Sequence, residues 1–322
     1  MNQELLKIGL AQIAPVWLDK KQTAEKIASF IADSGKQKCD LVVFGEALLP
    51  GYPFWVELLD GAKFNSIVQK EIYAYYLSQA VQPFSDDLKI IKDTVKKVRT
   101  AVVLGTIEKA KDRGGHSLYC SLIYLDKKGE VRSVHRKLMP TYEERLVWAQ
   151  GDGNGLQVHE LGAFKVGGLN CWENWMPLSR TALYGMGEDL HIAIWPGNKR
   201  NTEDITRFMA MESRSYVISV SGLMRKKDIQ SSVPYAELIL KNSPDMLADG
   251  GSCLVAPNGN WLIEPQVGNE TLIMAEIDHK LVRMERQNFD VAGHYSRPDV
   301  TKLYVNRKRQ RVIETNEENV ED

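Results

Sequence analysis

Two patterns of hydrophobic and polar positions recur along the chain: short continuous apolar runs and longer segments with helical spacing. The runs at residues 39–46 and 101–109 are typical of strands buried on both faces, because they do not alternate with polar positions. The pattern at 116–126, the turn sequence DKKGE and the pattern at 131–137 together predict a β-hairpin. The remaining predicted strands cover residues 7–15, 164–172, 191–198, 216–224, 253–263 and 271–278.

Segments with helical spacing lie between these runs. The predicted helices cover residues 22–35, 65–99, 177–187 and 202–216. The long second region is expected to break near Pro83, the third helix opens at Pro177, and Thr202 is the predicted cap of the fourth. Helices that alternate with continuously apolar strands predict an α/β fold whose sheets are covered by helices.

The alternation extends over residues 1–303 without a short-period repeat or a linker rich in proline and serine, so we expect a single domain. After Tyr304 the composition changes, because NRKRQR is basic, ETNEENVED is acidic and apolar residues are few. Residues 304–322 are therefore predicted to form a charged tail that is disordered or serves as an assembly arm.

The composition narrows the class of protein. The chain has 322 residues, of which 43% are hydrophobic and 26% are charged, and its formal net charge is -1. This balance argues against nucleic acid or an anionic membrane as the main partner, since both call for a basic surface. No apolar run is long enough to span a bilayer, and residues 1–15 lack the apolar core of a signal peptide. We therefore expect a cytoplasmic protein.

The cysteines and histidines show no spacing typical of a bound metal. The four cysteines form no CxxC pair, and the six histidines show neither HxH nor HExxH spacing. Reduced thiols are the expected state, because a chain of this length folds without disulfides. The sequence thus predicts no metal and no cofactor.

Three predicted strands end in a reactive side chain. Glu46 ends the run LVVFGE, Lys137 ends VRSVHRK, and Cys171 ends KVGGLNC. Because ligands bind at strand ends in α/β sheets, we expect these side chains to meet in one crevice. Together they would supply a base, a positive charge and a nucleophile. The lysine and the start of the following helix are expected to lower the pKa of the Cys171 thiol.

Each of these residues also has a simpler structural interpretation. A single cysteine on a strand is more often a packing residue. We assign that role to the three other thiols, Cys39, Cys120 and Cys253. Glu46 alone is compatible with a helix cap, and Lys137 alone with a solvated charge. The sequence GDGNG at 151–155 is interpreted as a turn, because it lacks the GK[ST] continuation of a phosphate-binding loop. Only the combination of three strand ends favours catalysis.

The same segments resemble the nitrilase superfamily of carbon–nitrogen hydrolases. FGEALLPGYPFW is similar to the glutamate block of that family, HRKLMPTYEERLVWAQGDG to its lysine block, and GGLNCWENWMPLSRTAL to its cysteine block. The resemblance runs from Lys7 to about Leu303 and includes ESRSYV, GGSCLVAPNG and DVAGHYSRPDV in the expected order. CWEN followed by MPL, together with RKLMPTYEER, is similar to the nitrilase branch rather than to the amidase branches.

The resemblance implies a four-layer αββα sandwich with a catalytic triad of Glu46, Lys137 and Cys171, supported by Glu144. It implies hydrolysis of an organic nitrile to the carboxylic acid and ammonia through a thioimidate and a thioester on the cysteine. The backbone N–H of Trp172 is the expected donor to the charge that develops during the reaction. The family also implies a homo-oligomer, either a dimer or a larger assembly such as a spiral.

The residues expected to bind the substrate lie near these strand ends, where clustered aromatic rings suit an apolar substrate. They are Tyr52, Trp55, Trp172, Trp175, Trp195 and Pro196. Any one of the tryptophans is equally compatible with core packing. The roles of Glu173 and Asn174 stay open, with orientation of the cysteine loop as one of them.

Three other functions are compatible with these residues. An amidase or a cyanide-converting member of the same superfamily would use the same triad. A thiol hydrolase would need a histidine base, for which His135 and His294 are the candidates. A binding or assembly module with this fold would need none of the three reactive side chains.

Overall fold

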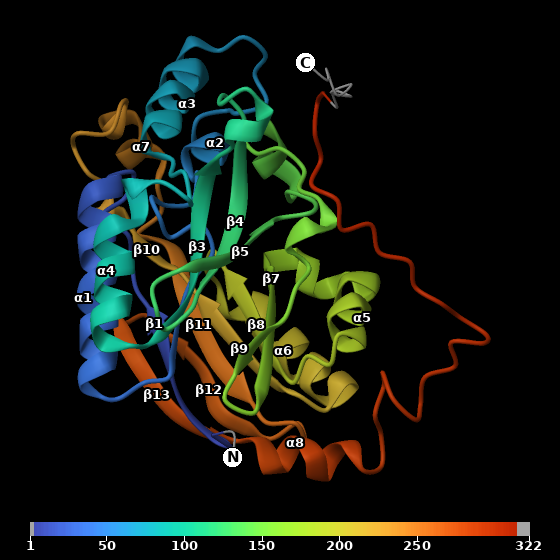
Figure 1. Ribbon diagram of the computed structural model, residues 1–322. Helices are drawn as coiled ribbons and strands as arrows, with labels where there is room; N and C mark the ends of the chain where they lie inside the picture. The colour runs from blue at the N-terminus through green and yellow to red at the C-terminus, as the bar shows by residue number, and fades with distance from the viewer. Residues whose placement is uncertain (1–2, 314–322) are drawn as a thin grey trace, which may run out of the picture.

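The structure, a computed structural model, describes residues 3–313 and contains two stacked β-sheets with helices on their outer faces (Figure 1). The first sheet has the order β13 (Thr271–Asp278), β1 (Leu5–Gln12), β2 (Leu41–Phe44), β3 (Ala101–Lys109), β4 (Leu118–Leu125) and β5 (Val131–Arg136). The second has the order β10 (Leu223–Arg225), β11 (Met246–Val255), β9 (Tyr216–Ser221), β8 (Leu190–Trp195), β7 (Phe164–Asn170) and β6 (His159–Leu161), and β12 (Trp261–Val267) pairs with β11. Strands β1, β2 and β3 run parallel, as do β7, β8 and β9.

Eight α-helices lie within the described residues. They are α1 (Lys20–Lys36), α2 (Trp55–Leu58), α3 (Ile67–Gln79), α4 (Lys89–Val98), α5 (Pro177–Gly185), α6 (Lys199–Ser213), α7 (Ala236–Asn242) and α8 (His279–Arg286). Apolar residues of α1 and α4 pack on the outer face of the first sheet, and those of α5 and α6 pack on the second (Figure 1). None of the helices in residues 3–313 combines the length and apolar character needed to cross a membrane.

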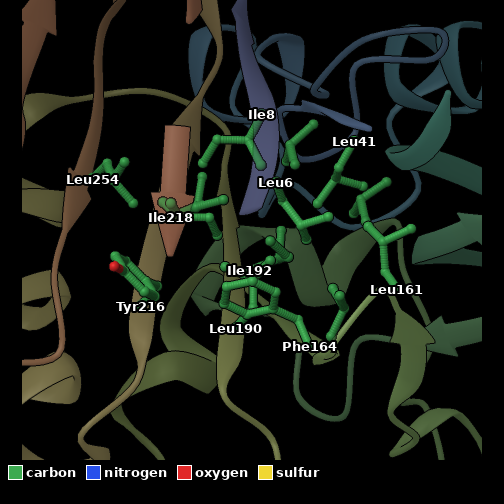
Figure 2. Close-up of a cluster of buried hydrophobic side chains, with 14 of the residues drawn as sticks. Leu6, Ile8, Leu41, Leu161, Phe164, Leu190, Ile192, Tyr216, Ile218 and Leu254 are labelled. Carbon is green, nitrogen blue, oxygen red and sulfur yellow. The ribbon is translucent and has the colours of Figure 1, made fainter. Parts of the chain in front are cut away.

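The largest part of the core lies between the two sheets (Figure 2). Leu6 and Ile8 of β1 meet Phe164 of β7, Ile192 of β8 and Ile218 of β9, and all five side chains are fully buried. Each such side chain contributes about 1.5–3 kcal/mol to the free energy of unfolding, which explains the apolar runs in both sheets. The order helix, sheet, sheet, helix confirms the predicted αββα sandwich.

The structure corrects two details of the predicted elements. The strand predicted over 216–224 is divided into β9 and β10 at Gly222, where a Cβ atom would overlap the carbonyl oxygen of Pro196. Thr202 is not the cap of α6, because that helix begins one turn earlier at Lys199. The Thr202 side chain is buried, and its hydroxyl donates to a carbonyl oxygen of β11 at 2.7 Å. Helices α2, α7 and α8 are not among the predicted elements.

The first part of the predicted tail lies against the body of the protein. The Arg309 guanidinium is 3.0 Å from the Asp152 carboxylate, which also accepts the backbone N–H of Gln310 at 2.9 Å. The Asn154 side chain donates to the carbonyl oxygen of Arg307 at 3.1 Å. Residues 314–322 lie outside the described residues. The single domain and the disorder or assembly role of the tail therefore stay predictions.

Candidate active site

Glu46 lies just beyond the end of β2, where the two sheets approach each other. Its backbone N–H donates to the carbonyl oxygen of Trp195 at the end of β8, 3.1 Å away. Gly105 of β3 packs against the backbone of Gly45 and Glu46 so closely that a Cβ atom there would overlap both residues. The Glu46 side chain is consequently buried, and both sheets fix its position.

The side chain of Lys137 lies between two buried carboxylates. Lys137 follows β5, and its backbone N–H donates to the carbonyl oxygen of Cys120 on β4 at 2.8 Å. Its Nζ atom is 2.8 Å from Oε1 of Glu46 and 2.7 Å from Oε2 of Glu144, which belongs to the 3₁₀ turn η3 (Tyr142–Leu146). All three side chains are buried, so the ammonium has the two charged partners that its removal from water requires.

Cys171 begins the 3₁₀ turn η5 (Cys171–Trp175) directly after β7. Its φ angle of 50° is in the left-handed region and turns the chain sharply at the strand end. The Asn174 side chain holds this turn by donating to the carbonyl oxygen of Cys171 at 2.8 Å. The Cys171 sulfur and carboxylate oxygens of Glu46 and Glu144 lie within 4.8 Å of one another. The fold thus brings together the four polar residues expected from the sequence.

Burial and neighbouring charges set the protonation states of this group. Burial raises the pKa of Glu46 to about 7, although Lys137 acts in the opposite direction. Burial also raises the pKa of the Cys171 thiol well above its ordinary value, and Glu46 adds to this effect. The expected lowering of that pKa is therefore wrong, because Lys137 and the Trp172 N–H offset only part of the increase. For Lys137, burial favours the neutral form, but Cys171 and the carboxylates outweigh it and raise its pKa. The site therefore holds a neutral thiol beside an ammonium.

The two carboxylate oxygens of Glu46 have different surroundings. Oε1 accepts hydrogen bonds from Lys137 and, at 3.2 Å, from the thiol of Cys120. Oε2 is buried and has no hydrogen-bond partner within residues 3–313. The sequence predicts Cys120 to be only a packing residue, and this contact corrects that interpretation. The unpartnered oxygen of Glu46 is available to accept a proton.

A second buried glutamate, Glu173, belongs to η5 itself. Its carboxylate accepts the backbone N–H of Asn170 at 2.8 Å and that of Leu138, and it lies 3.0 Å from Nε2 of His135. Burial alone would raise the pKa of Glu173, but His135 and the two N–H groups lower it below its ordinary value. Because Leu138 follows the lysine, Glu173 ties the segment after β5 to the turn that carries the cysteine.

The two histidines considered as bases for a thiol hydrolase lie in other surroundings. His135 is buried against Glu173, as described above. His294 is exposed and its ring packs beside Tyr295. Within residues 3–313, neither imidazole forms a hydrogen bond with Cys171, so the structure does not support a Cys–His pair at this thiol.

A cavity of about 730 Å³ opens at Cys171. Four of the six predicted substrate residues line it, namely Tyr52, Trp172, Trp175 and Pro196. The Tyr52 hydroxyl donates to Oε1 of Glu144 at 2.9 Å, so this ring also orients that carboxylate. Trp172 and Trp175 are 54% and 47% exposed, which leaves their rings available to a bound molecule.

The other two predicted substrate residues are part of the core. Trp55 is fully buried beside Trp17 and Tyr76, with ring centroids 6.4 and 4.6 Å away. Trp195 is also fully buried, and its indole N–H donates to the hydroxyl of Ser219 at 3.1 Å. Neither is among the described residues that line the cavity, so the structure does not support the predicted contact of Trp55 and Trp195 with substrate. Trp195 is the last residue of β8 and Trp55 follows β2 in sequence, but both side chains point into the packed layers.

Several residues that line the cavity are not among those predicted from the sequence to bind substrate. They are Phe54, Thr141, Asn198, Arg200, Met246 and Leu247. Phe54 and Thr141 stand within the glutamate and lysine blocks, and Asn198 follows β8, so proximity to a strand end is the feature that they share with the predicted residues. The segment that carries Met246 and Leu247 begins β11, far from any reactive side chain in sequence.

Known proteins with similar sequences and folds place this chain in a family. Residues 7–287 match the family model described as carbon-nitrogen hydrolase. A nitrilase 2 from an unknown prokaryotic organism is 33% identical over 308 residues, which cover 95% of this chain and 94% of that relative. An aliphatic nitrilase of Rhodococcus rhodochrous is 31% identical over 330 residues, with 96% and 85% covered.

The fold has solved counterparts as well. The crystal structure of Saccharomyces cerevisiae Nit3, a member of branch 10 of the nitrilase superfamily, superimposes with a TM-score of 0.69 at 20% identity. The superposition covers 91% of this chain and 97% of that chain. The chain therefore belongs to the carbon–nitrogen hydrolase family, which confirms the predicted superfamily. It is similar to nitrilases over nearly its whole length.

Proposed function

We propose that this chain is a nitrilase, which converts an organic nitrile and two water molecules into a carboxylic acid and ammonia. The nitrilases that match it over nearly its full length support this class of hydrolase. One observation carries the assignment of roles. The Lys137 ammonium bridges the carboxylates of Glu46 and Glu144, and the Cys171 thiol lies beside them where the cavity opens.

The first addition forms a bond between the Cys171 sulfur and the nitrile carbon. Because the thiol is neutral at rest, it needs a base at the moment of attack, and Oε2 of Glu46 is the oxygen without a partner. Glu46 takes the thiol proton and passes it to the nitrile nitrogen, which gives a thioimidate. A pKa of about 7 suits both transfers, because the carboxyl group then gains and loses a proton near neutral pH.

The second stage uses the same base for water. Glu46 removes a proton from a water molecule that attacks the thioimidate carbon, and it returns the proton to nitrogen. The carbon–nitrogen bond breaks, ammonia leaves, and a thioester remains on Cys171. A second water molecule then breaks the carbon–sulfur bond, releases the acid and restores the thiol.

Lys137 and the N–H of Trp172 stabilise the charge that develops on nitrogen or oxygen during both additions. Glu144 holds Lys137 from the opposite side to Glu46 and keeps the ammonium in place. Tyr52 in turn fixes Glu144. The exposed rings around the cavity provide an apolar surface for the organic part of the nitrile, while Pro196 contributes to the wall.

The function is tested by supplying nitriles and the corresponding amides separately and measuring ammonia and acid. Aliphatic, aromatic, arylacetonitrile and dinitrile substrates, together with cyanide, cover the classes among which the family divides. We expect one equivalent each of ammonia and acid from at least one nitrile class, and no turnover by Cys171→Ala. Hydrolysis of amides alone, or of cyanide alone, would identify an amidase or a cyanide-converting enzyme instead. No turnover by the folded protein would favour a binding module.

We also propose a cytoplasmic homo-oligomer. The four cysteines are buried and free, in keeping with a reducing compartment. Leu178 on α5 and Phe208 and Met211 on α6 are large apolar side chains that are 66%, 48% and 41% exposed. Exposed apolar surface of this kind supports association with a second copy of the chain. Light scattering measures the assembly size, and a monomer at all concentrations would contradict the proposal.

A further inference from the structure

Cys120 is a buried thiol that the proposed reaction does not use. It lies on β4, and its side chain is 1% exposed. The sulfur is 3.2 Å from Oε1 of Glu46, and the carbonyl oxygen accepts the backbone N–H of Lys137 at 2.8 Å. A single residue thus contacts both the base and the lysine. Cys253, which is equally buried, has its sulfur 3.6 Å from the hydroxyl of Thr206 instead.

The contact with Glu46 distinguishes two oxygens that are chemically equivalent in a free carboxylate. Rotation about the last side-chain bond would turn the carboxylate plane and move the free oxygen, because that torsion is broad. Two donors on the same oxygen, the Lys137 ammonium and the Cys120 thiol, oppose this rotation. Oε2 is left without a partner among the described residues.

We propose that Cys120 is a positioning residue, whose thiol holds Glu46 with Oε2 directed to the reacting proton and favours the ionised form of that carboxylate. The inference rests on the proposed function for the role of Glu46. A thiol that donates to a carboxylate stabilises its charged form, so loss of the donor makes Glu46 easier to protonate. The protonated carboxyl group cannot act as a base. Without the Cys120 donor, the enzyme should therefore need a higher pH than the wild type to reach the same fraction of its maximal activity.

Replacement of Cys120 removes none of the other ionisable groups around Glu46. They are Lys137, Glu144, Cys171, Tyr52 and Tyr76. Any change in the pH profile therefore reports the thiol itself. A thiol is a weaker donor than a hydroxyl, so we expect the acidic limb of kcat/KM to move up by about 0.5–1 pH unit when the donor is removed.

The experiment compares Cys120→Ala with Cys120→Ser, since both remove the sulfur and only serine keeps a donor. Cys253→Ala is the matched control for loss of a buried thiol. We measure kcat/KM against pH for the nitrile that the wild-type enzyme hydrolyses fastest, and thermal unfolding for every variant. In the alanine variant the acidic limb of kcat/KM should lie at a higher pH than in the wild-type enzyme. In the serine variant it should return most of the way to the wild-type pH, and in Cys253→Ala it should be unchanged. Cys120→Val replaces alanine if that variant does not fold.

The proposal would be overturned if the acidic limb of the alanine, valine and serine variants lay at the same pH as that of the wild-type enzyme, even if all three had lower activity. A limb that moves equally in alanine and serine would also overturn it, because packing rather than the hydrogen bond would then be responsible. The rate at which iodoacetamide alkylates Cys171, followed by mass spectrometry against pH, gives a second profile of the same base. If the wild-type protein hydrolyses no nitrile, the proposed function fails, and the alkylation profiles still decide the role of Cys120.

Discussion

Two buried glutamates flank the Cys171 turn, and their surroundings differ. Glu173 is satisfied by two backbone N–H groups and by His135, and its pKa is lowered. Glu46 has both of its donors on one oxygen, leaves the other without a partner among the described residues, and has its pKa raised to about 7. The same type of side chain is thus held as an anion in one place, and in the other it has the raised pKa and the unpartnered oxygen that suit the proposed base.

The difference teaches that burial alone does not make a base. Both carboxylates are removed from water, and burial raises the pKa of each. The number and placement of donors decide the net direction. A carboxylate whose oxygens are all occupied has a structural role, whereas one with a free oxygen beside a thiol has a chemical role. Substitutions that affect Glu46 and spare Glu173, or the reverse, test this distinction.

The largest effect is expected for Cys171→Ala, which removes the proposed nucleophile. The nitrilase activity should fall by at least about 10⁴-fold, because no other thiol can reach the substrate carbon. The unfolding temperature should stay close to that of the wild-type protein. Cys39→Ala is the control, since that thiol lies near Met274, away from the site, and its activity should be retained. Hydrolysis by the Cys171 variant at the control rate would refute the mechanism.

Glu46→Gln and Lys137→Met should each lower kcat by about 10²–10⁴-fold, which is the range for loss of a general base or of a positioned charge. Glu46→Gln should destabilise the fold at pH 8 by less than Glu173→Gln does. The reason is that glutamine removes the cost of a buried charge, although it leaves Lys137 with Glu144 as its one charged partner among the described residues. A carboxyl group whose folded pKa is raised weakens the fold as pH rises between the unfolded value and about 7, and glutamine removes that cost. A large loss of stability in this variant, seen in chemical denaturation, would place Glu46 in the same class as Glu173.

Glu173→Gln should have the opposite signature, a loss of about 2–3 kcal/mol in the free energy of unfolding with a smaller loss of kcat. Its folded pKa is lowered, so its stabilisation is present above the unfolded pKa near 4.5 and disappears as pH falls through the folded value. The difference from wild type should therefore be large at pH 7 and shrink in acid. Glu130→Gln, at an exposed site, is the control. A fully stable but inactive Glu173→Gln protein would contradict the structural role.

The pH profile of the wild-type enzyme should reflect Glu46 rather than Glu173. Because the base must be ionised, kcat/KM should fall as pH decreases through about 7, to roughly a tenth of its maximum one unit below. Stopped assays of ammonia between pH 5 and 9 measure this limb. An acidic limb below pH 5 would mean that Glu46 keeps the pKa of an ordinary carboxyl group.

The smallest effect on activity is expected at the cavity wall. Trp175→Ala should raise KM by about 3- to 10-fold for an apolar nitrile and leave stability nearly unchanged, because the ring is half exposed. Trp55→Ala should instead cost about 3–5 kcal/mol of stability, as expected for a buried aromatic residue. Steady-state kinetics and denaturation on the same two preparations separate the roles. Equal KM values for wild type and Trp175→Ala would remove that ring from the substrate site.

Sequence patterns predicted sheets covered by helices and the group of reactive residues because each has a local signal, whereas the four-layer order came from the family resemblance. Continuous apolar runs mark strands buried on both faces, and Glu46 and Cys171 follow such runs, while Lys137 ends the second strand of the predicted hairpin. Trp55 and Trp195 show the limit of this reasoning. Proximity to a strand end fixes where the backbone lies, but the direction of a side chain depends on packing against distant segments.

The contacts of Cys120 and Glu173 were out of reach for the same reason. Cys120 lies in a uniformly buried strand, where nothing local distinguishes a thiol that packs from one that contacts a carboxylate 74 residues away in sequence. The partners of Glu173 include His135, 38 residues earlier. Such long-range pairs decide whether a pKa rises or falls, and they become visible only when the two sheets are assembled.

The central claim is that Glu46 moves protons while Lys137 stabilises charge around one thiol, and intact-mass spectrometry tests it most directly. Glu46→Gln and Lys137→Met are mixed with a nitrile that the wild-type enzyme hydrolyses, and the mass of each protein is followed with time. Loss of the Glu46 charge leaves Lys137 to favour the thiolate, so addition to Cys171 can occur, but water is not activated to resolve the product. The account predicts that one substrate adduct accumulates on Glu46→Gln and is scarce on Lys137→Met. Equal adduct in the two variants, or an adduct on Cys171→Ala, would contradict it.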